Sequence, residues 1–383
     1  MQCIINLMLS LKPALTIFIS VFVLLIIFAI VYQFQLISLN SIIDEPIFSP
    51  TPLITTKQNQ TQKPQLSLTN TQKLSQILMT TLSGYKLTEK EIDDINTGKL
   101  GNIILLSKNI HNAEQLKQLT SAIYQQATFS GMLPLIAVDQ EGGAVSRIPW
   151  IENTAQNQIS SEDEAYQIAW LRGQQLKELG VNTNFAPVIE TANQNSFIAK
   201  QKRGFASQSA VLAQAMVRGY QQTGILAVVK HFPAGLGRVD VDPHRRMPVL
   251  NSSEEEIISD IMSFIDLSAS AIMVTHLLYP LVDATPTSAS RLFLEDILRD
   301  DLAFDGLIIS DDLSMGAIKA NYLVEDYAQS SLQAGTDLLI ITSSKDYQKV
   351  YDKLLDSCFD ELGCQKTIDQ HIERVLKLKR TLE

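Results

Sequence analysis

Two adjacent carboxylates, Asp311 and Asp312, close an apolar run and are the first candidates for chemistry. The run 306–310 has the character of a buried strand, so both acids would emerge at a strand end. A carboxylate in that position can attack the anomeric carbon of a sugar. It can equally cap the next helix, a task that Asp312 or Ser314 would also perform. The spacing leaves both interpretations of Asp311 open.

A second candidate pair, Asp242 and His244, is separated only by Pro243 in a loop after the apolar run 226–232. Because proline stiffens the segment, both side chains can point the same way. A carboxylate beside an imidazole orients the ring and stabilises its protonated form. Such a histidine could protonate a leaving oxygen and then activate a water molecule. A solvated polar loop without chemistry explains the same residues equally well.

The segment 139–143 (DQEGG) places Asp139 and Glu141 beside two glycines that allow a tight backbone turn. These carboxylates could bind sugar hydroxyls or a metal ion, or simply form a polar loop that leaves a buried strand. No further cluster of Asp, Glu and His has ligand spacing nearby, and no glycine-rich phosphate loop follows a strand. The sequence therefore predicts no metal site and no cofactor.

Short apolar runs alternate with longer helical stretches from about residue 71 onwards. There are eight such runs: 77–82, 101–107, 134–139, 181–187, 226–232, 271–276, 306–311 and 336–342. Most are continuously apolar, as parallel strands buried on both sides are. Eight β-then-α units predict an α/β fold with a (β/α)8 TIM-type barrel, and a doubly wound open sheet is the alternative. The tail 365–383 is expected to form a final helix on the barrel exterior.

The candidate residues collect at the ends of these runs. Asp139 closes the third run, Lys230 and His231 end the fifth, His276 closes the sixth and Asp311 closes the seventh. In barrel enzymes the chemistry takes place at the carboxyl ends of the strands. The sequence therefore predicts that these side chains share one site.

The N-terminal part differs from the rest. Residues 1–43 contain one charge, Lys12, and the uncharged apolar run 14–32 is close to the ~20 residues that a membrane-spanning helix needs. It is longer than the core of a cleaved signal peptide, so we expect a cytoplasmic stub and a transmembrane signal anchor at 1–43. The composition of 44–70 predicts a flexible linker, and 71–383 would form the barrel domain. The single lysine before the helix predicts a single-pass protein with an extracytoplasmic catalytic domain.

Charge and cysteine content narrow the class of protein further. The 383 residues include 31 Lys and Arg against 41 Asp and Glu, a net charge of −10. This balance argues against nucleic acid as a partner, because nucleic-acid binding needs a basic face. Cys358 and Cys364 lie six positions apart, and spacing alone leaves open whether they form a disulfide or stay unlinked.

Several motifs in this order resemble glycoside hydrolase family 3, in particular its single-domain β-N-acetylglucosaminidase branch. The resemblance covers roughly residues 72 to 380. The matching segments are 101–109 (GNIILLSKN), 136–143 (IAVDQEGG), 184–188 (NFAPV), 230–233 (KHFP), 242–244 (DPH), 273–276 (MVTH) and 304–315 (FDGLIISDDLSM). This family has the barrel fold that the apolar runs predict.

The resemblance implies a role for each matched residue. The first Asp of the Ser-Asp-Asp-Leu motif is the nucleophile, which is Asp311 here. In the Asp-x-His motif the histidine is the acid/base and the Asp its partner, which gives His244 and Asp242. The residues that would bind the sugar are Asp139, Arg147, Arg203, Lys230 and His231.

Three departures from the family pattern are present. Ala144 stands where the family usually has Arg, and Glu190 follows the NFAPV motif where Asp is usual. The segment 234–238 (AGLGR) replaces the usual Gly-His-Gly-Asp, and the loop from there to His244 is one residue longer. None of these changes removes a catalytic group, but the altered loop concerns the leaving-group side and hence the choice of substrate.

The expected function is that of a retaining β-N-acetylhexosaminidase that hydrolyses terminal β-linked N-acetylglucosamine from glycans, peptidoglycan fragments in particular. The expected partners are this carbohydrate substrate and, through the N-terminal helix, a membrane. A phosphorylase on the same scaffold is one alternative, because a neutral histidine would not repel phosphate. An inactive, membrane-tethered glycan-binding protein is the other, and the presence of Asp311, Asp242 and His244 together argues against it.

Overall fold

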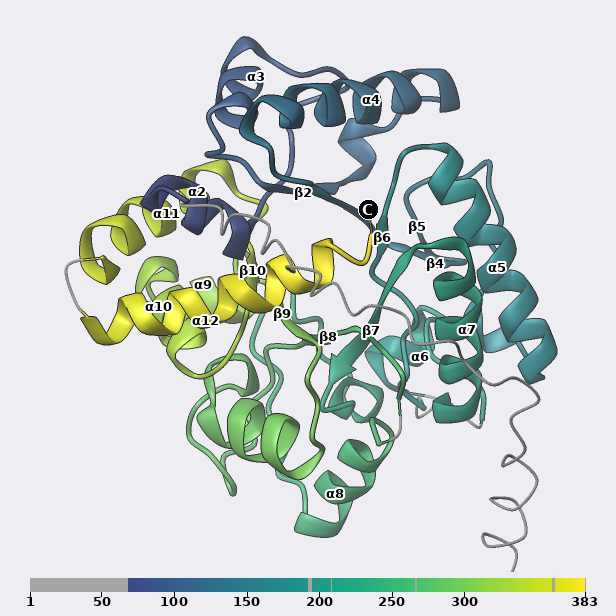
Figure 1. Cartoon of the computed structure of the whole chain (residues 1–383). Helices are drawn as coiled ribbons and strands as arrows, with labels where there is room; N and C mark the ends of the chain where they lie inside the picture. The colour runs from purple at the N-terminus through teal and green to yellow at the C-terminus, as the bar shows by residue number, and fades with distance from the viewer. Residues whose placement is uncertain (1–67, 192–194, 208, 266, 360–361, 383) are drawn as a thin grey trace, which may run out of the picture. The chain divides into compact units, whose positions relative to one another are not determined.

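A computed structural model describes residues 68–382 apart from 192–194, 208, 266 and 360–361. Eight parallel strands form one sheet in the order β1-β10-β9-β8-β7-β6-β3-β2 (Figure 1). Their bounds are β1 Leu78–Met79, β2 Asn102–Leu105, β3 Leu135–Val138, β6 Thr183–Asn184, β7 Leu226–Phe232, β8 Ala271–Val274, β9 Leu307–Asp312 and β10 Leu338–Ile340. Seven of the eight predicted runs contain one of these strands, and the run 306–311 covers all of β9 except Asp312, so the strand predictions are confirmed.

The first and last strands of this order are joined by Thr80, which follows β1. Its N–H donates to the carbonyl of Asn102 at 3.2 Å, and its carbonyl accepts from the N–H of Ile104 at 2.9 Å. The sheet is therefore nearly closed, as in a TIM-like barrel, and the open-sheet alternative is set aside. Closure brings the carboxyl ends of all eight strands to one rim.

Strand β7 shows why most strand positions are apolar. All seven of its residues are buried. Leu226 and Val228 belong to a cluster with residues of the opposite strands inside the barrel, whereas Ala227 and Val229 pack against the surrounding helices. Because successive side chains of a strand point to opposite faces, a strand buried on both faces is apolar at most positions. The two polar residues of β7, Lys230 and His231, lie near its carboxyl end, where both have polar partners.

Helices surround the sheet (Figure 1). Those before β7 are α2 Asn70–Ile77, α3 Glu89–Asn96, α4 Ala113–Ser130, α5 Glu162–Glu178, α6 Phe197–Lys200 and α7 Ser209–Thr223. Those after β7 are α8 Glu254–Met262, the π-helix η5 Leu292–Asp301, α9 Gly316–Lys319, α10 Val324–Gln333, α11 Ser344–Cys358 and α12 Leu362–Lys379. Short 3-10 turns, among them η3 Gly235–Arg238 and η4 Thr287–Ala289, lie in the loops.

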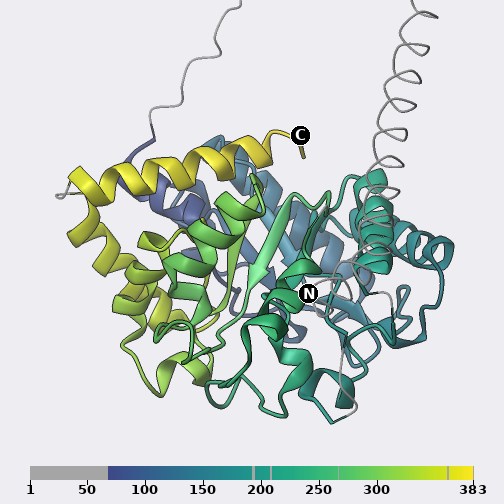
Figure 2. The same cartoon turned by 90° about the horizontal axis from the view of Figure 1, so that it is seen from below.

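Helix α12 differs from the expected exterior helix. Figures 1 and 2 show it lying across one end of the sheet. Its Val375 belongs to the same cluster as the residues inside the barrel, and Leu378 packs against that cluster. The helix therefore covers the amino end of the barrel core and leaves the carboxyl rim to the loops.

The predicted membrane anchor is corrected. In the described part of the chain no helix is long and apolar enough to cross a membrane. The longest helices there, α4 and α12, have 18 residues each and carry charged side chains such as Glu114 and Glu373. The apolar run 14–32 lies outside the described residues. The predictions of a transmembrane helix before the barrel and of a membrane-anchored location are therefore wrong. The predicted domain limits at residues 43 and 70 stay predictions.

The structure answers the question that the cysteine spacing left open. Cys358 and Cys364 form a disulfide, with their Cα atoms 4.9 Å apart. Both cysteines are buried, and the bond joins the end of α11 to the first turn of α12.

Candidate active site

The strand-end carboxylates Asp311 and Asp312 have different partners. The carboxylate of Asp312 accepts the N–H groups of Ser314 at 2.9 Å and of Thr342 at 3.0 Å, and it also accepts the hydroxyl of Thr342. Asp312 therefore fixes the turn after β9 to the segment after β10. Asp311 accepts only the N–H of Asp312, at 2.9 Å, among the hydrogen bonds of the described residues. The helix that follows, α9, begins after Met315 without a side-chain cap, so neither acid has the capping role that competed for Asp311.

The pair Asp242 and His244 is joined in the loop after η3. The Nδ1–H of His244 donates to Oδ1 of Asp242 at 2.8 Å, and the backbone N–H of His244 donates to the same oxygen at 3.0 Å. This contact fixes the tautomer, so Nε2 is the ring atom that can exchange a proton with a substrate. The side chain of His244 is 66% exposed.

Backbone contacts attach this loop to the segment after the two acids. Gly316 N–H donates to the carbonyl of His244 at 2.9 Å, and Ala317 N–H donates to the carbonyl of Pro243 at 3.1 Å. A Cβ on Gly316 would lie 2.6 Å from the carbonyl oxygen of His244, which explains the glycine at this position. The acid/base candidate and the nucleophile candidate, 67 positions apart in the chain, are thus held by one packed turn.

A β-hairpin positions the residues of the DQEGG motif. Its strands are β4 Gln140–Gly142 and β5 Val145–Ser146. The side chain of Asn184 accepts the N–H of Gln140 and donates to its carbonyl, each at 3.0 Å. Gly142 has φ 96°, and a Cβ there would meet the carbonyl oxygen of Thr154 at 2.0 Å. The hairpin needs the glycine, and it carries Arg147 back towards Asp139, with 3.5 Å between their nearest N and O atoms.

Four of these side chains form a buried ionic cluster. Nζ of Lys230 lies 2.7 Å from Asp139 and 2.7 Å from Glu141. Arg203 donates two hydrogen bonds to Glu141, at 2.8 and 2.9 Å. Burial opposes ionisation, but Arg203 and Lys230 hold the pKa of Glu141 at about 2, and Asp139 and Glu141 raise the pKa of Lys230. All four groups are therefore charged at neutral pH and fixed in place.

His231 joins this cluster through its ring. Its Nδ1–H donates to Oε1 of Glu190 at 2.8 Å, and its Nε2 accepts from Arg203 at 3.3 Å. Burial lowers the pKa of His231 well below its usual value, helped by the positive charges of Arg203 and Lys230. Burial also raises the pKa of Glu190 to about 8. A neutral, buried imidazole whose two ring nitrogens both have protein partners can position Arg203 but is a poor acid.

The sequence pointed to Glu141 as a possible ligand of sugar or metal without giving it a role in the family motif, and it did not indicate Glu190 as a site residue. Glu141 stands in the same motif as Asp139, and Glu190 was visible only as a departure from the family pattern. His276 contacts the segment of the two acids from behind. Its ring is hydrogen-bonded to the hydroxyl of Ser288 at 2.7 Å and to the carbonyl of Asp312 at 3.2 Å. Within the described residues no group of three His, Cys, Asp or Glu could hold a metal ion.

A candidate nucleophile, an Asp–His pair and a buried polar cluster thus meet at the carboxyl rim of a parallel barrel, which is the arrangement of a barrel hydrolase. Residues 69–378 match the Glycosyl hydrolase family 3 N terminal domain. A Beta-hexosaminidase of Nitrosomonas eutropha is 33% identical over 297 residues, which are 73% of this chain and 83% of that protein. For a Beta-hexosaminidase of Pseudomonas aeruginosa the identity is 34% over 282 residues, 70% of this chain and 82% of that protein.

The solved structures that are similar to this chain have related names. A glycoside hydrolase family 3 beta-N-acetylglucosaminidase from Paenibacillus has a TM-score of 0.77 at 29% identity, over 82% of this chain and 63% of that one. The chain thus spans less than two thirds of that protein. A Beta-N-acetylhexosaminidase from Beutenbergia cavernae has a TM-score of 0.70 at 26% identity, over 82% of this chain and 98% of that one. The protein belongs to glycosyl hydrolase family 3 and is a glycoside hydrolase.

Proposed function

We propose that the protein is a retaining β-N-acetylhexosaminidase. It removes terminal β-linked N-acetylglucosamine from glycans, including fragments derived from peptidoglycan. The substrate follows from the relatives, whose names specify hexosaminidase or N-acetylglucosaminidase activity. The observation that carries the mechanism is the contrast between Asp311 and Asp312. One carboxylate is committed to the turn, and the other keeps free electron pairs at a strand end.

In the first step a carboxylate oxygen of Asp311 forms a bond to the anomeric carbon. The bond from that carbon to the glycosidic oxygen breaks, and the oxygen takes a proton from Nε2 of His244. In the second step His244, now neutral, accepts a proton from water. The hydroxide attacks the anomeric carbon and displaces Asp311. Two inversions at the same carbon give net retention.

Asp242 supports His244 in both steps. The carboxylate accepts the Nδ1–H of the ring and so directs Nε2 towards the glycosidic oxygen. After proton transfer the ring is neutral, so it does not repel the anionic Asp311 when that carboxylate leaves. A second carboxylate in place of the histidine would carry a negative charge at this stage.

The buried cluster binds the terminal sugar. Asp139 and Arg147 line its accessible edge, since both are only partly buried. Lys230 and Arg203 hold the two carboxylates of the cluster in place, and His231 positions Arg203 through its Nε2 atom. Charged hydrogen-bonding groups that are already fixed lose little entropy when the sugar binds.

Paired variants test the assignment. Asp311→Asn should lower hydrolysis of a chromogenic N-acetylglucosaminide by more than about 1000-fold, because the amide cannot act as a nucleophile. Asp312→Asn should keep more of the activity, since it only weakens the turn. NMR of the first-formed sugar should show the β-anomer, and added phosphate should leave the product unchanged. Activity in Asp311→Asn, an α-anomer or a sugar 1-phosphate would each contradict the proposal.

A further inference from the structure

Two departures of this chain from the family pattern lie next to each other in the structure. Glu190 stands where the family usually has Asp, and the altered loop begins with the segment 234–238 in place of Gly-His-Gly-Asp. Glu190 is fully buried. Leu236 of the altered loop belongs to the same small apolar cluster as Val188, two residues before Glu190. The longer acid and the changed loop therefore belong to one packed part of the barrel rim.

On one side Glu190 contacts the buried ionic cluster. Its segment is paired with the end of β7, where the N–H of Ile189 donates to the carbonyl of Lys230 at 2.8 Å. Oε1 of Glu190 accepts the Nδ1–H of His231 at 2.8 Å, and Nε2 of His231 accepts from Arg203 at 3.3 Å. Glu190 thus fixes the ring that positions Arg203.

On the other side Glu190 contacts the altered loop. Burial raises the pKa of Glu190 to about 8, and Arg203 and the backbone N–H groups of Gly237 and His231 oppose this rise. The N–H of Gly237 therefore faces the carboxyl group of Glu190. Leu236, the residue before Gly237, is 1% exposed and anchors the loop at this point. One carboxyl group thus sets the distance between the ionic cluster and the altered loop.

The position of the altered loop affects both halves of the site. The carbonyl of Val239 accepts the N–H of Phe197, the first residue of α6, at 2.8 Å, and His244 follows Val239 five positions later. Just after the other end of α6, the N–H of Arg203 donates to the carbonyl of Ile198 at 3.1 Å. A shift of the loop would therefore move the acid/base candidate and, through α6, the arginine of the ionic cluster.

We infer that Glu190 is a positioning residue, whose side-chain length holds the altered loop, and with it His244, in register with the buried ionic cluster. The inference rests on the proposed function, because it concerns the placement of the groups that bind and cut the glycoside. An aspartate would end one methylene earlier and could not reach both His231 and Gly237 from the same backbone position. Glutamine has the full length and keeps an oxygen that can accept from His231.

The test compares Glu190→Gln with Glu190→Asp on a chromogenic N-acetylglucosaminide, after circular dichroism has shown that both variants are folded. Glu190→Gln should keep kcat and KM within about twofold of the unaltered protein. Glu190→Asp, although it restores the residue usual in the family, should lower kcat and raise KM, each about tenfold, because the acid/base and the sugar-binding groups are both displaced. A purely structural residue would change the stability and leave kcat and KM of the folded protein unchanged.

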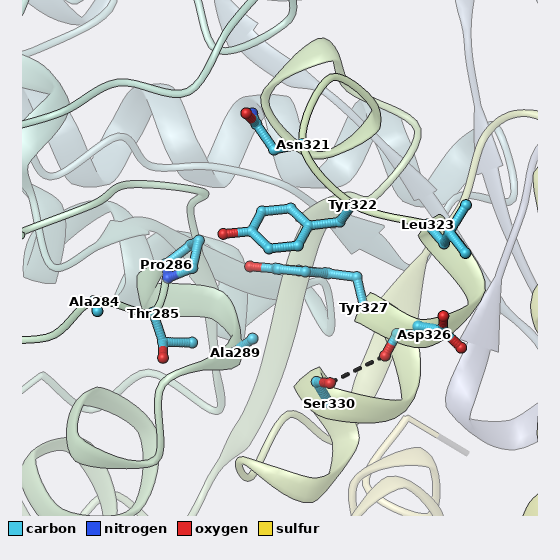
Figure 3. Close-up of a pocket in the computed structure, with 10 residues that line it drawn as sticks. All are labelled: Ala284, Thr285, Pro286, Ala289, Asn321, Tyr322, Leu323, Asp326, Tyr327 and Ser330. Atoms are coloured by element: carbon cyan, nitrogen blue, oxygen red, sulfur yellow. Dashed lines mark hydrogen bonds between the residues drawn. The ribbon is translucent and has the colours of Figure 1, made fainter.

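A control and a second variant separate the altered loop from other loops at the rim. Figure 3 shows Leu323 at a cavity between the loops after β8 and β9, and none of the candidate site residues lines that cavity. Leu323 is 64% exposed, so Leu323→Ala should leave kcat and KM unchanged. Leu236→Ala loosens the altered loop directly and should lower kcat by itself. Combined with Glu190→Asp, it should lower kcat by less than the product of the two single losses, because both changes act through one loop.

The outcomes separate this inference from the proposed function. Unchanged kinetics in Glu190→Asp, an equal loss in Glu190→Gln, or losses that multiply in the double variant overturn the positioning role. If Glu190→Asp does not fold, an unchanged kcat in Leu236→Ala overturns it. If the unaltered protein does not hydrolyse the glycoside, the proposed function fails. Calorimetry with N-acetylglucosamine then decides separately: the affinity should fall about tenfold in Glu190→Asp and stay within about twofold in Glu190→Gln, and equal affinities overturn the inference.

Discussion

The two ends of the barrel use buried and half-buried carboxylates in opposite ways. At the amino end Asp337, just before β10, is fully buried and accepts hydrogen bonds from His371 at 2.8 Å, Arg374 at 2.9 Å and the N–H of Ile308 at 2.8 Å. Arg299 adds an ion pair. Burial alone would raise the pKa of Asp337, but these partners lower it. The carboxylate joins α12 to the strands and has no capacity left for a ligand.

At the carboxyl end Asp311 accepts one hydrogen bond from its neighbour's backbone, and one oxygen of the buried Glu190 has no partner among the described residues. Saturated carboxylates stabilise a fold, whereas an unsaturated one retains electron pairs for chemistry. The comparison teaches that the state of hydrogen bonding separates Asp337, which joins elements of the fold, from Asp311, the proposed nucleophile.

The largest expected effect concerns proton transfer at the carboxyl end. His244→Ala should slow cleavage of a substrate with a poor leaving group by about 10²–10⁴-fold, because that departure needs a proton. A substrate with a good leaving group should show a burst of glycosyl-enzyme and partial rescue by azide. Stopped-flow kinetics on both substrates measure this. Equal slowing of both substrates, with no burst and no rescue by azide, would show that another residue is the acid/base. That residue would not be Glu141, because its carboxylate is ion-paired with Arg203 and Lys230.

The next effect concerns stability at the amino end. Asp337→Asn leaves two arginines and a histidine without their anion, so the free energy of unfolding should fall by about 3–5 kcal/mol. Asp311→Asn is the matched control at the other end and should change it by no more than about 0.5 kcal/mol. Urea denaturation of the three proteins gives both numbers. A larger loss for Asp311→Asn than for Asp337→Asn would reverse the comparison.

A smaller effect is expected where backbone geometry alone holds the site. In Gly316→Ala the new Cβ would meet the carbonyl oxygens of Arg245 and His244, at 2.5 and 2.6 Å, and push the acid/base loop away. We expect kcat to fall about ten- to hundredfold without a change in the pKa values of the pH profile. Gly363→Ala, where a Cβ would meet nothing within 4 Å, is the control. Full activity in Gly316→Ala would show that the loop position is unimportant.

The smallest effect is a pH dependence of stability. Burial raises the pKa of Glu190 to about 8 in the folded state, so between its ordinary value and pH 8 the folded protein binds more protons than the unfolded chain. The contribution of Glu190 to stability is therefore greatest at low pH and is lost as pH rises towards 8. Glu190→Gln should remove this slope in denaturation curves measured at pH 5 to 9. The same slope in both proteins would contradict the raised pKa.

Much of the architecture could be predicted because it depends on local patterns. A strand buried on both faces is apolar over most of its length, and β7 and β9 are recognisable by the apolar runs at their amino ends. The rule that parallel barrels place chemistry at carboxyl strand ends located Asp139, Lys230 and Asp311. The position of α12 across the amino end was not predictable, since an amphipathic helix packs equally well on the side of a barrel.

By itself, the sequence determined the eight strands, the family motifs and the types of residue available for catalysis. Tertiary structure decided which of the adjacent acids is free, because Thr342, in the segment after β10 and 30 positions away, satisfies Asp312. It likewise paired Glu141 with Arg203, 62 positions apart, and Glu190 with His231, 41 positions apart. Local sequence specifies backbone preference and burial within a few residues, whereas hydrogen-bond saturation depends on partners that only the closed barrel brings together.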